Sequence, residues 1–205
     1  MTGISSAQAA ALALVAPALE PGTYLAGGVA AALTLGHRTS IDLDLFVPTE
    51  FDQERLGERI ASQTPDARVV GRGPGTLHLE VGGVPTSILS YRYPLLAPAS
   101  PRAELPVPVA SLEDLLCMKL SAIAGRGAAK DFWDLDELLA RGIAGGSLEG
   151  ALGLFTRKYA TEDVGHVVRS LAYFAEADAA PLPAGLSREA WTALKARVLD
   201  RVRRL

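Results

Sequence analysis

Hydrophobic and polar positions follow different periods in the two halves of the chain. In the first half, short apolar or alternating runs predict strands at 23–26, 41–47, 67–72, 76–81 and 84–91. Three other segments of this half have helical spacing and predict helices at 5–18, 29–36 and 52–63. Gly-Pro-Gly and Gly-Gly separate the last three strands, which is typical of a meander of hairpins.

The second half has a helical pattern throughout. Five prolines between residues 92 and 109 predict an irregular connection. After Ser111, apolar residues recur with the helical period and predict helices at 112–124, 131–141, 147–157, 163–176 and 188–203. We therefore expect an α+β protein with an α/β core over residues 1–109 and a helical domain over residues 110–205.

Composition excludes several classes of protein. With 205 residues, 49% of them hydrophobic, the chain can bury a core, which excludes disorder over most of its length. A net charge of −3 excludes a generally polycationic nucleic-acid binder, so any nucleic-acid surface must be local. One cysteine and three scattered histidines exclude a cysteine zinc site and a histidine metal cluster.

The N-terminal apolar stretch does not have the pattern of a targeting signal. No lysine or arginine precedes Glu20, whereas a secretory signal needs a basic start. Gln8, Pro17 and Glu20 interrupt the stretch, which is therefore too short to cross a membrane. We expect a cytoplasmic protein without a membrane segment.

Charge is unevenly distributed along the chain. Residues 41–66 carry seven acids against two bases. The last eleven residues carry one acid and five bases: Lys195, Arg197, Arg201, Arg203 and Arg204. These bases are either a solvated helix end, where cations suit the helix dipole, or a patch that contacts phosphates.

Two carboxylates lie two residues apart in the strand predicted at 41–47. Side chains at this spacing point to the same face, so Asp42 and Asp44 would lie side by side on an otherwise apolar strand. Like charges in a half-buried place are unfavourable unless a cation neutralises them. Mg²⁺ prefers carboxylate oxygens and shares its remaining positions with phosphate, so the pair predicts an Mg²⁺ site.

A double glycine lies between the first predicted strand and the next helix. Gly27 and Gly28 would let a ligand approach the backbone, and the free N–H groups of a helix start favour an anion. Each feature alone has an ordinary explanation, a tight turn or a solvated acidic face. Together, with Arg38 and Ser40 just before the acids, they favour phosphoryl or nucleotidyl transfer.

The first helix of the second half places a lysine in an apolar stripe. Ser111 and Asp114 resemble a capping box at its start, and Lys119 follows in the middle of the stripe. Such a lysine must snorkel, pair with a buried acid or meet an anion. In the next helix Asp131 lies inside the apolar stripe and Asp134 at its edge; Asp131 could equally be an N-cap.

The segments AGGVAAAL, HRTSIDLDLFV and SLEDLLCMKLSAIAGRGAAKDFWDLDELL resemble the DNA polymerase β-type nucleotidyltransferase superfamily, in the form of its AbiEii/AbiGii toxin branch. The resemblance implies a polymerase β-like core with a small mixed sheet, followed by a helical bundle that contributes active-site residues. It implies Mg²⁺-dependent transfer of a nucleotide from an NTP to an acceptor. The acceptor would be RNA such as tRNA, and a cognate antitoxin would be a partner in a toxin–antitoxin or phage-defence pair.

The resemblance also implies individual roles. Asp42 and Asp44 would bind the metal and act in catalysis with three further residues, Lys119, Asp131 and Asp134. The residues that would bind the nucleotide are Gly27, Gly28, Arg38, Ser40 and Lys130.

One position departs from the pattern of the superfamily. Many of its members carry a third carboxylate on a later strand, where residues 84–91 offer only Ser87. Glu80, on the neighbouring strand with Thr76 and His78, is interpreted as part of a solvated face. The departure leaves a catalytically silent nucleotide- or partner-binding module open as an alternative. A second alternative is an enzyme acting on a small molecule of the antibiotic type, which the net charge of −3 favours because a cationic substrate would suit the acidic residues 41–66.

Overall fold

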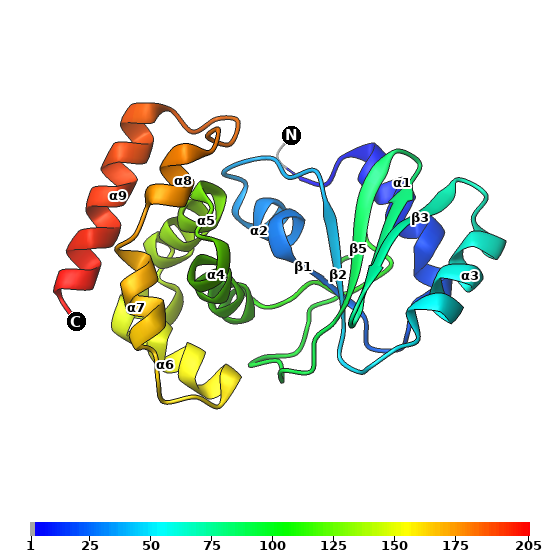
Figure 1. Cartoon of the computed structure of the whole chain (residues 1–205), viewed down its shortest axis with the longest axis horizontal. Coiled ribbons are helices and arrows are strands. Elements are labelled where there is room, and N and C mark those ends of the chain that lie inside the picture. The colour runs from blue at the N-terminus through cyan, green and yellow to red at the C-terminus, as the bar shows by residue number, and fades with distance from the viewer. Residues whose placement is uncertain (1–2) are drawn as a thin grey trace. The chain divides into compact units, whose positions relative to one another are not determined.

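The computed structural model describes residues 3–205 (Figure 1). The chain divides into two compact units, one ending at Ser111 and the other beginning at Leu112. The described strands all lie in the first unit, and the second consists of helices and their connections. This is the α+β class that the hydrophobic pattern predicts.

The first unit is built on a mixed five-stranded sheet. Its strands, in spatial order, are β1 (Tyr24–Ala26), β2 (Leu43–Val47), β5 (Val84–Ser90), β4 (Thr76–Val81) and β3 (Ala67–Gly73). β2 and β5 are parallel and the other neighbouring pairs are antiparallel. The predicted meander of β3, β4 and β5 is confirmed.

The first unit also contains helices. They are α1 (Ser6–Val15), the short 3-10 helix η1 (Ala16–Ala18), α2 (Gly27–Leu35) and α3 (Gln53–Gln63). Of these, α1, α2 and α3 contact the sheet. α1 contacts β5, whereas α3 contacts β3 and β4 and buries Leu56 and Ile60 (Figure 1). α2 follows β1 directly and packs on β1 and β2.

Alternation along the strands gives the sheet one apolar and one more polar face. Leu43, Leu45, Leu77 and Leu79 are buried on the apolar face, where they form the core with the helices. The residues between them, including Asp44, point to the other face. Asp44 is therefore the one residue of β2 that is not fully buried.

The strand predicted at 41–47 begins two residues later, at Leu43. β1 ends at Ala26, opposite Asp44, because the chain turns into α2 there, so no β1 residue remains to pair with Asp42. On the other side, the register places Pro85 opposite Asp42, and proline has no N–H to donate. Asp42 is thus an exposed residue just before the strand.

The second unit is a helical bundle. Its elements are α4 (Leu112–Arg126), α5 (Ala129–Ala140), the 3-10 helix η2 (Ile143–Gly146), α6 (Leu148–Tyr159), α7 (Gly165–Leu171), α8 (Ala175–Ala179) and α9 (Arg188–Arg203). α4 packs against α5, α6 and α7, and α9 packs against α5 and α7.

One segment predicted as a single continuous helix is divided in the structure. The segment expected to be a single helix at 163–176 is two helices, α7 and α8, with a turn at residues 172–174. The turn lets the ring of Phe174 pack against Phe132 and Trp191, with ring centroids 5.0 and 5.9 Å away. Burial of this aromatic cluster outweighs the local helical pattern.

Candidate active site

The double glycine lies against the strand carboxylate. Gly27 has a φ of +66°, and a Cβ atom added to it would lie 2.2 Å from Oδ2 of Asp44 and 2.8 Å from its Cβ. A side chain at position 27 is therefore excluded twice, by the left-handed backbone and by the neighbouring aspartate. The start of α2 and the carboxylate of Asp44 are in direct contact.

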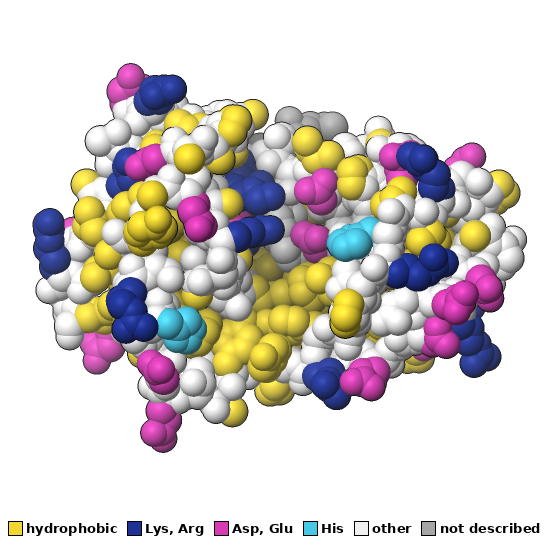
Figure 2. Space-filling model, viewed as in Figure 1, with side chains coloured by type: hydrophobic (Ala, Val, Ile, Leu, Met, Phe, Trp, Pro, Cys, Tyr) yellow, Lys and Arg dark blue, Asp and Glu magenta, His cyan; other side chains and the backbone are white. Residues whose placement is uncertain are grey.

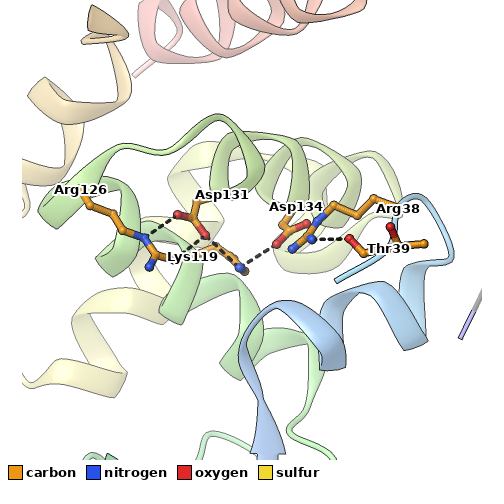
Figure 3. A network of polar contacts seen from close by, with 6 residues as sticks. All are labelled: Arg38, Thr39, Lys119, Arg126, Asp131 and Asp134. Atoms are coloured by element: carbon orange, nitrogen blue, oxygen red, sulfur yellow. Dashed lines mark hydrogen bonds and ion pairs between the residues drawn. The ribbon is translucent and has the colours of Figure 1, made fainter. Parts of the chain in front are cut away.

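Gly28 makes a similar close approach to the segment before the strand. A Cβ atom added there would lie 2.5 Å from Oγ of Ser40 and 3.2 Å from Nη2 of Arg38. Arg38 is only 6% exposed, and its Nη1 donates a hydrogen bond to the carbonyl oxygen of Thr39 at 2.9 Å (Figure 3). A buried guanidinium and a helix N-terminus together favour an anion.

We call Gly27, Gly28, Arg38, Ser40 and Asp44 the glycine cluster. Its members come from two separate segments of the sequence, the start of α2 and the approach to β2, and all lie in the first unit. Four of these five residues are those that the resemblance assigns to nucleotide binding, and the fifth is one of the two assigned to metal binding.

A buried glutamine of α1 holds the segment that precedes β2. Nε2 of Gln8 donates to the carbonyl oxygens of Ser40 and Ile41, both at 2.8 Å. Its Oε1 accepts the backbone N–H of Ser5 at 2.9 Å in a capping box. All hydrogen-bonding groups of this side chain are in use, so Gln8 fixes the segment between Arg38 and Asp42. The sequence pattern gave no functional sign of it beyond an interruption of an apolar stretch.

The protein supplies few ligands for a metal in this region. Among the described residues no group of three or more histidine, cysteine, aspartate or glutamate side chains is arranged to hold a metal ion. Asp44 and Asp42 are therefore insufficient for a closed protein cage. They fit Mg²⁺, which is commonly held by one or two carboxylates together with substrate phosphates and water.

Asp44 is the first of three polar residues that lie side by side across neighbouring strands of the sheet. The register places Ser87 of β5 beside Asp44, and His78 of β4 beside Ser87. Nδ1 of His78 lies 3.0 Å from Oγ of Ser87. Figure 2 shows acidic side chains beside a histidine on this face, over β2 and β5. The sequence pattern suggested only a solvated face for His78, and only the register reveals its place in the row.

The second unit brings together three of the predicted catalytic residues. Nζ of Lys119 lies 2.9 Å from Oδ1 of Asp131 and 2.7 Å from Oδ2 of Asp134. Nε of Arg126 lies 3.1 Å from Oδ2 of Asp131 (Figure 3). We call these four residues the lysine cluster. Two carboxylates and two cations make it close to neutral.

Burial decides between the alternatives for the lysine cluster. Lys119 is 4% exposed, so its amine does not snorkel to the surface, and the buried ion pair is the arrangement present. The N-cap of α5 is Ala128, so Asp131 is the third residue of the helix rather than its cap. Lys130 is half-buried and forms no ion pair with any residue between 3 and 205.

Ion pairs also involve the basic C-terminal segment. Arg197 and Arg201 of α9 both bind the carboxylate of Asp136, with Nη2 of Arg197 at 2.6 Å. The hydrogen bonds with Asp136 raise the pKa of Arg197 above its usual value. The two other paired cations are Lys195, which binds Asp178, and Arg204, which binds Asp200. Four of the five bases are thus neutralised within the second unit.

A comparison with known families decides the class of the protein. The sequence profile described as "Nucleotidyl transferase AbiEii toxin, Type IV TA system" matches residues 49–204. The chain belongs to the AbiEii nucleotidyltransferase toxin family. It is therefore a transferase, as its motifs predict. The match begins after Asp44, so it covers the lysine cluster and leaves the glycine cluster outside.

One sequence relative and one solved structure resemble most of this AbiEii family member. An uncharacterized protein of Aquifex aeolicus (strain VF5) is 36% identical over 156 residues, which are 75% of this chain and 74% of that protein. The structure of MenT4, a nucleotidyltransferase toxin of Mycobacterium tuberculosis H37Rv, is 18% identical with a TM-score of 0.64 and covers 97% of this chain and 82% of its own.

Two other solved structures share the fold. The antibiotic-resistance factor ANT(2'')-Ia is 16% identical, with a TM-score of 0.56, and covers 77% of this chain and 94% of its own. JHP933 from Helicobacter pylori is 19% identical, with a TM-score of 0.52. The alignment covers 99% of this chain and 95% of JHP933. These similarities confirm the expected nucleotidyltransferase fold.

Among the described helices, none has the length and apolar character needed to cross a membrane.

Proposed function

We propose that this AbiEii family member is an Mg²⁺-dependent toxin that transfers a nucleotide from an NTP to a hydroxyl group of an RNA such as tRNA. One observation carries the proposal: the carboxylate of Asp44 lies in contact with the glycine start of α2, 2.2 Å from the Cβ position of Gly27. A metal-binding acid and an anion-binding helix start are thereby adjacent.

The glycine cluster would bind the triphosphate. Asp42 and Asp44 would hold Mg²⁺, which supplies positive charge to the phosphate oxygens when bound. Nucleotidyltransferases of this fold generally use a divalent metal. The N–H groups at the start of α2, the Arg38 guanidinium and the Ser40 hydroxyl would bind the phosphates and orient the α-phosphorus toward the acceptor.

In the reaction, the acceptor oxygen attacks the α-phosphorus and forms a new O–P bond. The bond between the α-phosphorus and the oxygen that bridges to the β-phosphate breaks, and pyrophosphate leaves with that electron pair. Lys119 and Lys130 would stabilise negative charge as it develops. Asp131 and Asp134 would orient Lys119, because both carboxylates contact its Nζ.

The proposed toxin role rests on the description of the family. The family is described as a toxin of type IV toxin–antitoxin systems, so we propose a cellular RNA as acceptor and a cognate antitoxin protein as partner. A second candidate is a small cationic acceptor. It is favoured by the net charge of −3 and by the neutralisation of the basic residues of α9, which leaves little cationic surface there for RNA.

A labelling experiment separates these functions. The purified protein is incubated with each α-³²P-labelled NTP and Mg²⁺, with total tRNA, with a mixture of aminoglycosides, or alone. Label on RNA supports the proposed function, and label only on small molecules supports the second candidate. Nucleotide binding without any transfer would instead indicate a silent binding module.

A double variant tests the metal site. We expect Asp42→Asn with Asp44→Asn to abolish transfer while leaving the thermal unfolding midpoint close to that of the natural protein. Asp66→Asn is the matched control, since Asp66 is an exposed acid of the same acidic segment and lies outside the glycine cluster. Transfer that survives in the double variant would refute this assignment of the metal site.

A further inference from the structure

His78 lies on the sheet face that carries Asp44, two strands away from it. Asp44, Ser87 and His78 are register partners on β2, β5 and β4, so their side chains project from one row of the same face. Two strand spacings separate the backbones of Asp44 and His78 by about 10 Å. A phosphate group bound beside Asp44 would therefore share this face of the sheet with the imidazole of His78.

The imidazole of His78 is positioned by a hydrogen bond on one side and faces a glycine on the other. On one side Nδ1 meets Oγ of Ser87 at 3.0 Å. On the other side the ring lies over the backbone of Gly71, where an added Cβ would be 3.6 Å from Cδ2. The β3–β4 register shifts between Val69 and Gly71, and bulges of this kind often re-aim side chains beside functional sites. The ring is therefore oriented although His78 is exposed.

We propose that His78 is the residue that takes the proton of the acceptor hydroxyl. This inference rests on the proposed nucleotidyl transfer. As the acceptor oxygen attacks the α-phosphorus and pyrophosphate leaves, the hydroxyl proton passes to Nε2 of His78. Nδ1 keeps the other ring proton and donates a hydrogen bond to Oγ of Ser87. Ser87 is therefore a positioning residue.

Neighbouring charges on the same face do not compete for this role. Glu80, two residues along β4, is bound to Arg68 with Nη2 to Oε1 at 2.9 Å. Asp44 is assigned to the metal. Within the row itself, His78 is the remaining side chain with a nitrogen that can accept a proton. The carboxylate of Glu80 is thus engaged by a guanidinium, whereas an imidazole that bonds Ser87 through Nδ1 has its second ring nitrogen left to meet the acceptor hydroxyl.

Single-turnover kinetics test the proposal, with label transferred to total tRNA or to whichever probe accepts it. We expect His78→Asn to lower the rate constant of transfer about 100- to 10,000-fold, the usual contribution of a positioned base, without changing the dissociation constant for Mg²⁺–NTP. Ser87→Ala should cause a smaller loss. Added imidazole should restore part of the rate of His78→Gly. Glu80→Gln is the matched control and should transfer at the natural rate.

Two kinetic outcomes would overturn the assignment. One is transfer by His78→Asn at the natural rate while Asp44→Asn is inactive, which would leave the proposed function standing without a role for His78. The other is a loss in His78→Asn that arises entirely from weaker binding of Mg²⁺–NTP. An inactive natural protein would instead refute the proposed function, and the inference with it.

A spectroscopic measurement tests the proposed proton position without turnover. Long-range ¹H–¹⁵N NMR of the imidazole groups reports which ring nitrogen carries the proton in the neutral form. We expect the Nδ1–H form for His78, and a smaller fraction of that form in Ser87→Ala. An Nε2–H form in the natural protein would exclude His78 as the proton acceptor, because Nε2 would have no lone pair available.

Discussion

Residue 27 must combine a positive φ with an empty space beside Asp44, and only glycine meets both demands. We expect Gly27→Ala to lower the free energy of unfolding by about 1–3 kcal/mol, because its methyl group would clash with the carboxylate on a strained backbone. Transfer should be lost. Thermal unfolding and the labelling assay measure the two effects.

The matched control for this substitution is Gly73→Ala. Gly73 has no positive φ, and a Cβ added there meets no atom within 4 Å. Its stability and transfer should be unchanged. If Gly27→Ala behaved like Gly73→Ala, the close contact between the double glycine and Asp44 would be wrong.

Cys117 illustrates how burial controls reactivity at a single residue. Burial in α4 raises the pKa of the thiol from 9.0 to about 12. The thiol is therefore protonated at pH 8, and we expect native protein to resist alkylation by iodoacetamide, while unfolded protein reacts rapidly. Mass spectrometry of the two samples checks this. Rapid labelling of the native protein would contradict the burial.

The same pKa shift predicts a loss of stability at high pH. The folded state holds the thiol proton more tightly than the unfolded state, so the contribution is fully present below pH 9. It declines as pH rises from about 9 toward 12, because only the unfolded thiol ionises in that range.

At the scale of the element, α1 acts on the segment before β2 through one side chain. We expect Gln8→Ala to leave the carbonyl oxygens of Ser40 and Ile41 without their donor, which lowers stability by about 1–3 kcal/mol. The affinity for Mg²⁺–NTP should fall as well, because the segment carries Arg38, Ser40 and Asp42.

The corresponding control is Gln63→Ala, at the exposed end of α3. Isothermal titration with Mg²⁺ and a non-hydrolysable NTP measures the affinity, and thermal unfolding measures the stability. A Gln8→Ala variant that is destabilised yet binds Mg²⁺–NTP normally would show that Gln8 supports the fold and not the site.

Most elements were predictable because their signals are local. The period of hydrophobic positions, the helix caps and the turn residues predicted the five strands and most helices. The helix α9 was predicted with its observed bounds, Arg188–Arg203. The failures have non-local causes. Asp42 is outside β2 because Pro85, distant in sequence, lies opposite it, and α7 ends early because Phe174 packs against Phe132 and Trp191.

The candidate site was predictable to the extent that it lies in continuous motifs. The double glycine, the acids and Lys119 are motif residues. The contacts of Gln8, Arg126 and His78 were not predicted, because they involve other segments of the chain. Gln8 binds carbonyl groups more than 30 positions away, and His78 meets Ser87 only through the register of β4 and β5. A single sequence carries no direct sign of such contacts.

At the scale of the whole molecule, the second unit contains two buried lysines in different surroundings. Lys158 forms a fully buried pair with Asp114, with Nζ 2.6 Å from Oδ1. Lys119 contacts two aspartates, one of which also binds Arg126. Both lysines are expensive to remove, since each substitution leaves a buried carboxylate with fewer partners. Stability alone therefore cannot identify a functional lysine.

Comparing the two lysines separates catalysis from folding. We expect Lys158→Met to lower the free energy of unfolding by about 3–5 kcal/mol, and Lys158→Met with Asp114→Leu to recover much of that loss. At a temperature where circular dichroism shows the variants folded, both should still transfer label. Lys119→Met, and the charge-preserving Lys119→Arg, should be folded under the same conditions and deficient in transfer, because the amine of Lys119 is needed at its position between two carboxylates. Transfer that falls only in proportion to unfolding in all four variants would make the lysine cluster a structural ion pair, and would restrict the active site to the glycine cluster.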